Sequence, residues 1–368
     1  MNKNKTQINT SLILPLYIFI VVLSKIVRFT IMKSSLVNYT MGWGWVNSLN
    51  AGIGNFLISF NGESVATQNS IALFKYLRFF GASTFYEYEA LITIIFNFIV
   101  IYCISKCKNK VSIYEFLFLC MSIAVLNIWN FTLAKEPVQM LFFLVVFMLM
   151  NSRKTKNSLA FILSLIVILI IVFIYRNYYI LVVLYSVFSY FVIEKYIFKQ
   201  KKITAKTYIT LLIAIIVSYI VFLTATEKLM PDVYDQLMYL SNNVTVANTD
   251  ITPIFKSKNI FISSIEYIIT VFRMIIPIEL VKMGPKYILY FGYQLLITIF
   301  LFRTMLNLKD NPKKINYALY IFLGFLLASA YFEPDFGSWV RHESTVFPLL
   351  LIVFGFTKKE DKHESTNN

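Results

Sequence analysis

Long apolar runs, separated by short polar and basic segments, dominate the pattern of this chain. The runs do not alternate with a period of two, and about 20 apolar residues suffice for a helix to cross roughly 30 Å of hydrocarbon. In hydrocarbon every backbone N–H and C=O has to be paired within its own segment or a closed barrel, so these runs predict helices. We predict ten spans, at residues 11–31, 84–104, 112–130, 137–151, 158–175, 178–194, 207–224, 287–302, 315–332 and 344–356.

Composition leads to the same conclusion, because 58% of the 368 residues are hydrophobic and only 14% are charged. Soluble domains usually carry about 25% charged residues. Lipid is therefore the solvent of this chain. We expect an all-α, polytopic integral membrane protein that forms a single domain over residues 1–368, and a GT-C-like arrangement of its helices is compatible with this class.

The basic residues predict the orientation of the spans, since Lys and Arg of short loops stay on the cytoplasmic side during insertion. Of the 34 Lys and Arg, 20 fall in six short segments: residues 1–10, 105–111, 152–157, 195–206, 303–314 and the tail 357–368. This pattern predicts that both termini are cytoplasmic. The net charge of +15 then reflects topology and contact with anionic membrane lipids, and it does not indicate nucleic acid.

Two long segments, residues 32–83 and 225–286, are predicted to be outer loops. Both are much longer than a helix connection needs to be, which is typical of functional loops. The apolar, glycine-spaced stretch that begins at residues 41–45 suits a backbone lying in the membrane interface. Tryptophan also settles at that interface. All four tryptophans fall on the predicted outer side: Trp43, Trp45, Trp129 and Trp339.

Residues 261–281 are apolar enough to be mistaken for an eleventh span. They carry a polar stripe at Glu266, Thr270 and Arg273, spaced i, i+4 and i+7 along one helical face. A span at this place would also put the basic segment 303–314 outside. We therefore predict an interfacial or re-entrant helix here.

Three polar clusters lie on the predicted outer side, where ionisable groups close to lipid indicate function. Residues 135–137 (Lys-Glu-Pro) form a tight turn, for which the alternative is a local ion pair before a helix that begins with Pro. Residues 176–179 (Arg-Asn-Tyr-Tyr) form the turn of a hairpin, for which the alternative is an arginine that snorkels to water. Residues 333–343 hold two acids, Arg341, His342 and Glu343 beside a tryptophan, and the alternative is an ordinary solvated loop.

Familiar catalytic signatures are missing from the sequence. We find no Walker A motif, dinucleotide fingerprint, zinc-binding His pair or nucleophile elbow, which argues against ATP-driven transport and metal-dependent hydrolysis. The three cysteines, Cys103, Cys107 and Cys120, lie on the predicted inner side or within a helix and offer neither a disulfide framework nor a four-ligand metal site. We expect no metal and no cofactor.

The layout resembles that of the Wzy-type polymerases, which join lipid-linked repeat units of bacterial capsule, exopolysaccharide or O-antigen. The resemblance covers the whole pattern of about ten spans, a large outer loop late in the chain, and outer arginines. Locally it rests on Lys135-Glu136 opening a span, Arg176 in an aromatic turn, and Arg341-His342 before the apolar residues 347–351. The resemblance implies that a glycan is transferred from an undecaprenyl-pyrophosphate carrier to a sugar hydroxyl of another lipid-linked unit. A flippase and a chain-length regulator are candidate partners, and the sequence leaves open whether the regulator is required.

This chemistry requires groups that hold pyrophosphate and a base that takes the proton of the acceptor hydroxyl. Arginine matches pyrophosphate oxygens in bidentate fashion, and aromatic faces suit sugar rings. The candidates for substrate binding are Arg176, Arg273, Arg341, Lys135, Trp339 and Tyr178. The candidates for the base are His342, Glu136, Glu333, Asp335 and Glu343.

Other functions stay open at this point. A GT-C glycosyltransferase that uses a polyprenyl-phosphate sugar usually has an acid early in its first outer loop, where this chain has Glu63, with Glu87 and Glu89 just inside the next span. A flippase or transporter commonly shows paired repeats with interrupted helices, and we find no repeat. A ten-span acyltransferase would resemble a family with Arg and His near its first spans on the inner side, where this chain has no His.

Overall fold

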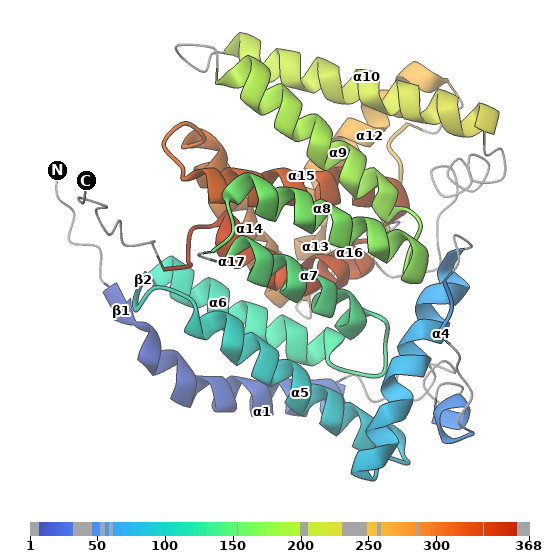
Figure 1. Cartoon of the computed structure of the whole chain (residues 1–368), viewed down its shortest axis with the longest axis vertical. Coiled ribbons are helices and arrows are strands. Elements are labelled where there is room, and N and C mark those ends of the chain that lie inside the picture. The colour runs from blue at the N-terminus through green and yellow to red at the C-terminus, as the bar shows by residue number, and fades with distance from the viewer. Residues whose placement is uncertain are drawn as a thin grey trace. The chain divides into compact units, whose positions relative to one another are not determined.

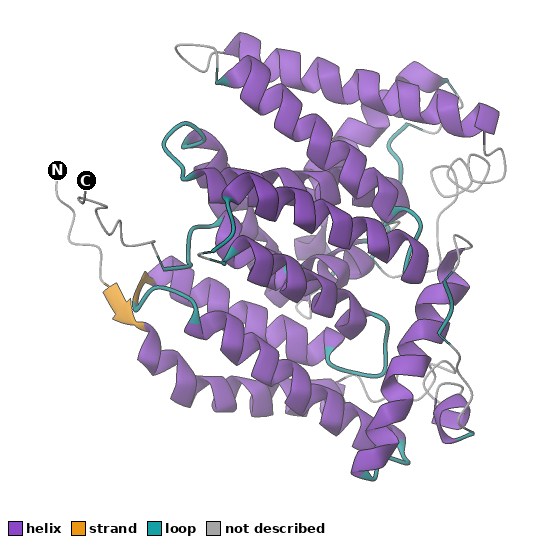
Figure 2. Cartoon of the chain, in the orientation of Figure 1, coloured by secondary structure: helices purple, strands orange, loops and turns teal. Residues whose placement is uncertain are grey.

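Helices form wherever the sequence carries a long apolar run, and the described chain contains only two short strands, β1 (Gln7–Asn9) and β2 (Lys110–Ser112) (Figure 2). The computed structural model describes residues 7–31, 46–51, 56–58, 62–152, 154–198, 205–229, 249–255, 259–284, 287–333 and 335–358. The stretch 41–45 that we expect at the interface lies outside these residues, as do Trp43 and Trp45.

Nine of the ten predicted spans coincide with helices. They are α1 (Ile13–Ile31), α5 (Phe85–Ser105), α6 (Ile113–Val125) with the π-helix η3 (Leu126–Asn130), α7 (Glu136–Met150), α8 (Asn157–Ile174), α9 (Tyr179–Val192), α10 (Ala205–Leu229), α14 (Ile288–Leu306) and α15 (Lys313–Phe332). Within the described residues, six helices are long and apolar enough to cross a membrane: α1, α5, α6 with η3, α8, α14 and α15. The chain is therefore an all-α, polytopic membrane protein.

The tenth predicted span, residues 344–356, differs from the prediction. Its helical part is only α17 (Phe347–Val353), and a separate helix, α16 (Phe336–Thr345), precedes it. Pro348 lies in the first turn of α17, where its missing N–H is tolerated and where it prevents continuation from α16.

The segments that we predict as outer loops contain further helices. The first has α4 (Gly62–Phe74) and the 3₁₀ helix η2 (Lys75–Phe80), and the second has α12 (Ile260–Ile275) and α13 (Glu279–Lys282). The described chain also contains two shorter elements, the 3₁₀ helix η1 (Thr10–Leu12) and the π-helix η4 (Ile193–Ile197), and residues 46–50 are helical.

Contacts divide the chain into two compact units. Unit 1 comprises residues 1–177, 312–318 and 344–368, and unit 2 comprises residues 178–311 and 319–343. In unit 1, α1, α5 and α6 lie side by side, and α7 packs against α8 and α17 (Figure 1). In unit 2, α12 packs against α10 and α14, and α13 also packs against α14.

Polar residues fix where the helices of unit 1 begin. Thr84 and Glu87 form a capping box at the start of α5, and Ser112 and Glu115 form one at the start of α6. In each box the hydroxyl accepts a backbone N–H of the first turn and the carboxylate accepts the N–H of the cap residue, which satisfies donors that a helix start leaves free.

Three segments that we predict to be cytoplasmic meet at one end of unit 1. Strand β1 pairs antiparallel with β2, so that Gln7 lies opposite Ser112. The N–H of Lys108 donates to the carbonyl of Phe356 at 2.8 Å, and Cys107 forms a bridge with Thr357. The described ends of the chain therefore lie on the same side as the connection between α5 and α6.

Candidate functional site

The connection between α15 and α16 brings together two of the predicted catalytic residues. Glu333 follows the last residue of α15 and His342 lies in α16, and the Glu333 carboxylate approaches His342 Nδ1 at 2.6 Å. Both side chains are buried, with 3% and 4% of their surfaces exposed. A buried carboxylate at this distance fixes the imidazole orientation and favours a proton on Nδ1, which leaves Nε2 as a proton acceptor.

Asp335 organises the turn that precedes α16. Its Oδ1 accepts the backbone N–H of Ser338 at 2.8 Å and the hydroxyl of Thr249 at 3.0 Å. The backbone of Asp335 also pairs with that of Asp250. These bonds make Asp335 the cap of α16 and tie the helix to the segment that begins at Thr249.

Arg341 precedes His342 in α16 and is half-buried, with Nη2 at 3.4 Å from Ser338 Oγ. Glu343 follows His342 and is fully buried, and its Oε1 lies 3.3 Å from Gln294 Nε2 of α14. Three consecutive side chains of α16 thus differ in chemistry: a guanidinium, an imidazole held by a carboxylate, and a carboxyl held by an amide.

Trp339 is enclosed by the protein and offers no ring face on the surface. Its side chain is fully buried, its Nε1–H donates to the carbonyl of Met274 at 3.1 Å, and its ring stacks on Phe325 at 5.8 Å between centroids. The indole therefore packs against α15 and its N–H bonds to α12.

The remaining predicted residues of unit 2 also make specific contacts. Arg273 donates from Nε to Glu279 at 2.7 Å and from Nη1 to the carbonyl of Thr252 at 2.7 Å. Tyr178 stacks on Phe332, the residue before Glu333, with 4.9 Å between ring centroids. Arg273 therefore stabilises the segment around α12, whereas Tyr178 lies close to the Glu333–His342 pair.

Unit 1 brings together the other three predicted residues. The Tyr175 hydroxyl, at the end of α8, donates to the carbonyl of Lys135, just before α7, at 2.8 Å. Glu136 is buried at the start of α7, and Arg176 is buried beside the Tyr175 ring at 5.7 Å. Because only 7% of Arg176 is exposed, it does not snorkel to water.

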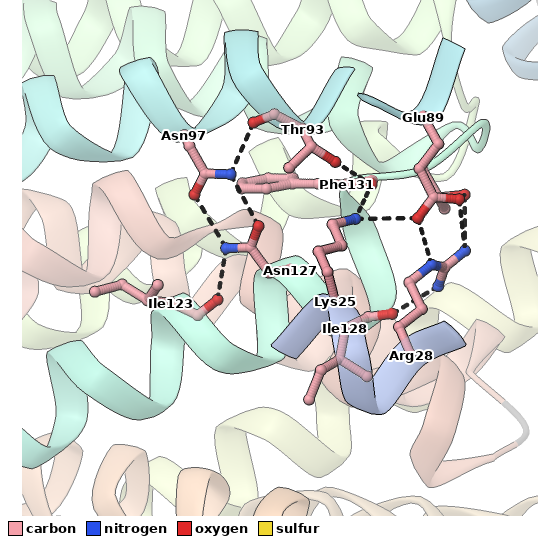
Figure 3. Close-up of polar contacts among 10 residues, drawn as sticks. Lys25, Arg28, Glu89, Thr93, Asn97, Ile123, Asn127, Ile128 and Phe131 are labelled. Carbon is pink, nitrogen blue, oxygen red and sulfur yellow. Dashed lines mark hydrogen bonds and ion pairs between the residues drawn. The ribbon is translucent and has the colours of Figure 1, made fainter. Parts of the chain in front are cut away.

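A buried ionic cluster in unit 1 was not among our predicted sites. Glu89 of α5 accepts from Arg28 Nε at 2.6 Å and from Lys25 Nζ at 3.0 Å, both on α1 (Figure 3). Arg28 also donates to the carbonyl of Ile128 at 2.6 Å, and Lys25 to that of Phe131 at 2.8 Å. The cluster ties α1 to α5 and caps the carboxyl end of η3, whose dipole favours cations.

A second polar layer lies further along the same helices. The side-chain amides of Asn97 in α5 and Asn127 in η3 exchange two hydrogen bonds, at 2.8 and 3.0 Å (Figure 3). Tyr17 of α1 donates to Asn97 Oδ1 at 2.5 Å. Such bonds between spans fix helix pairing in lipid.

Comparison of the chain with protein-family models, with curated proteins and with solved structures finds no match. The residue chemistry therefore carries the functional argument alone. Among the described residues, no group of three or more His, Cys, Asp or Glu is arranged to hold a metal ion.

Proposed function

We propose that this protein polymerises undecaprenyl-pyrophosphate-linked oligosaccharide repeat units into a surface polysaccharide, at the outer face of the bacterial cytoplasmic membrane. The observation that carries this proposal is the buried contact of 2.6 Å between Glu333 and His342, with Arg341 adjacent in α16. Both termini lie in the cytoplasm, so that this connection faces outward, as the distribution of Lys and Arg indicates.

The reaction needs little beyond positioning and proton removal, because pyrophosphate is a good leaving group. The acceptor hydroxyl oxygen attacks the anomeric carbon of the donor glycan, and the bond from that carbon to the pyrophosphate oxygen breaks. His342 Nε2 takes the hydroxyl proton while Glu333 stabilises the resulting imidazolium. Undecaprenyl pyrophosphate leaves with the electron pair, and Arg341 holds its charge.

The contacts of the other acids favour His342 as the base. Asp335 caps α16, and Glu343 lies fully buried against Gln294. Glu136 opens α7 in unit 1, and Tyr175 links the turn of Lys135 to the turn that contains Arg176. We assign Lys135 and Arg176 to binding of a second lipid-linked substrate.

Two of the three acids considered for a GT-C reaction with a polyprenyl-phosphate sugar, Glu87 and Glu89, have structural contacts, and the side chain of the third, Glu63, lies outside the described part of the chain. Glu87 accepts the N–H groups of Ser83 and Thr84 at 2.8 Å and caps α5. Glu89 is held by Arg28 and Lys25. Both carboxylates thus have structural partners, which leaves neither as an obvious base.

One observation favours a second candidate, a flippase or transporter for the same lipid-linked oligosaccharide. Helix α12 stops at Ile275 beside Thr298, near the middle of α14. Helices interrupted at mid-membrane are common in carriers. A transporter moves its substrate without changing it, so product analysis separates the two functions.

The test is complementation of a bacterial strain that lacks its own copy of the gene. Each variant is brought to equal membrane abundance, and the lipid-linked glycans are sized. We expect polymer from the natural chain, and single repeat units that are reachable from the outer face in cells with His342→Ala. Single units that accumulate only on the inner leaflet would instead support the flippase, and an unchanged glycan profile after deletion would contradict both.

A further inference from the structure

Helix α12 ends beside the middle of α14, a helix that is long and apolar enough to cross a membrane. Thr298 Oγ1 donates to the carbonyl of Ile275, the last residue of α12, at 2.5 Å. Thr298 lies ten residues after the start of α14, which is about 15 Å along a helix. Further up α12, the Tyr267 hydroxyl donates to the carbonyl of Leu327 at 2.7 Å, close to the end of α15 at Phe332.

The segments before α12 and after α13 indicate on which side of the membrane the chain enters this stretch and on which side it leaves. Helices α14 and α15 are consecutive candidate spans joined by residues 307–312. Ile288 at the start of α14 and Phe332 at the end of α15 therefore lie on the same side of the membrane. The segment before α12 bonds to the turn after Phe332, through Thr249 and Asp335, and the segment after α13 leads to Ile288. The stretch from α12 to α13 therefore enters and leaves on the same side, as a re-entrant hairpin.

Polar side chains close the buried end of this hairpin. Trp339 of α16 donates to the carbonyl of Met274, and Thr298 of α14 donates to that of Ile275. Glu343 lies one turn after Trp339, and Gln294 lies one turn before Thr298, so they project from the same helix faces. Their contact at 3.3 Å thus belongs to the same buried layer.

Two acceptor atoms in this layer have no donor. Glu343 Oε2 and Gln294 Oε1 are both buried and lack a hydrogen-bond partner in the described structure. The side chains themselves are 0% and 1% exposed. Burying an unpaired carboxylate costs much free energy. A neutral carboxylic acid avoids this cost and also has an O–H group that can donate a hydrogen bond.

Several charged groups on the surrounding elements have partners of their own. On α12 and α13, Arg273 pairs with Glu279 and lies 3.9 Å from Glu266. On α15 and α16, His342 pairs with Glu333, and Arg341 contacts Ser338. In the part of the chain that the structure describes, Glu343 has Gln294 as its one hydrogen-bond partner and takes part in no ion pair.

We propose that Glu343 and Gln294 form a proton-binding site at the end of the re-entrant hairpin. A proton on Glu343 Oε2 donates to Gln294 Oε1, while Gln294 Nε2–H donates to Glu343 Oε1. A single proton thereby satisfies both unpaired acceptors and removes the charge. The two side chains then join α14 and α16 through two hydrogen bonds without a net charge. Loss of the proton removes one of these bonds and weakens the connection between the two helices.

The test is infrared difference spectroscopy of the purified full chain in lipid nanodiscs at neutral pH. Subtracting the spectrum of Glu343→Gln should reveal the C=O band of a protonated carboxyl, with the downshift expected in D₂O. In Gln294→Leu this band should move to higher frequency, because its acceptor is gone. Glu266→Gln is the matched control, since Glu266 is similarly buried but accepts two backbone N–H groups near Arg273, and should lack this band.

Thermal unfolding supplies a second readout that does not depend on activity. Gln at position 343 can exchange the same two bonds with Gln294, so Glu343→Gln should keep its Tm within about 2 °C of the natural chain, whereas Glu343→Ala should lose more than about 4 °C. Absence of a protonated carboxyl band, or a Glu343→Gln variant as unstable as Glu343→Ala, would overturn the proposal.

Discussion

The Glu333 carboxylate meets His342 Nδ1 at 2.6 Å across the turn between α15 and α16. The two residues are nine positions apart in sequence, and Asp335 between them holds the turn by accepting the N–H of Ser338. This arrangement gives a histidine whose orientation is fixed by a buried acid, as a general base requires. It also makes each member of the pair separately testable.

Glu333→Gln should slow polymerisation by roughly 100-fold to 10,000-fold while KM stays close to that of the natural chain. The amide preserves the shape of the side chain but does not stabilise an imidazolium. The measurement is the initial rate of glycan extension with purified protein. A rate within a few-fold of the natural one would show that Glu333 has no positioning role.

Glu89→Gln should lower the free energy of unfolding by about 3–5 kcal/mol, because Arg28 and Lys25 would keep their buried charges without a carboxylate. Thermal unfolding in detergent measures the loss. Glu87→Gln is a suitable control, since this acid caps the same helix at an exposed position and should have a much smaller effect. Equal losses in both variants would contradict a special role for the cluster.

Gly324→Ala should destabilise unit 2 by about 1–3 kcal/mol, as overpacking usually does. A Cβ at this position would lie 2.5 Å from the carbonyl oxygen of Val182 and closer still to Ser186 Oγ. Helices α9 and α15 would therefore have to separate. Ser186→Ala removes only the hydroxyl and its bond to Val182, so it should be clearly milder in the same unfolding assay.

Cysteine labelling in cells tests the topology. A cysteine at exposed Lys282 should react with an impermeant reagent from outside, and one at Lys309 should react only after the membrane is opened. Native thiols interfere little, since Cys103 and Cys107 are buried, burial raises the pKa of Cys107 to about 12, and half-buried Cys120 can be replaced. If the cysteine introduced at Lys282 were labelled only after the membrane is opened, α12 would cross the membrane and the predicted topology would be wrong.

The apolar runs were sufficient to predict the fold class and the places of nine helices, six of which are long and apolar enough to span a membrane, because in lipid each helix satisfies its own backbone. They were less informative at residues 344–356, where α16 ends at Thr345 and the short helix α17 begins at Phe347, with Pro348 in its first turn. Run length alone cannot distinguish one span from two short helices whose backbone ends are satisfied by the protein around them.

The candidate site was predictable only in part. The density of ionisable residues at 333–343 marked Glu333 and His342 as separate candidates, and their contact at 2.6 Å is visible only in the structure. The cluster of Lys25, Arg28 and Glu89 joins helices more than 60 residues apart in sequence, so its assembly depends on packing. Its available signal was the pair of cations spaced i, i+3 inside an apolar run, which is costly without a buried partner.

The most direct test of the account is extension of a purified lipid-linked repeat unit by purified protein in detergent, with product length read by mass spectrometry. No membrane separates two sides in this assay, so transport cannot produce a signal. We expect a ladder of polymer from the natural chain, and a loss of roughly 100-fold to 10,000-fold in rate for His342→Ala with substrate binding retained. Arg341→Lys should be nearly inactive, because it keeps the charge and loses the planar fork. Unaltered single units from the natural chain, or a full ladder from His342→Ala, would contradict the account.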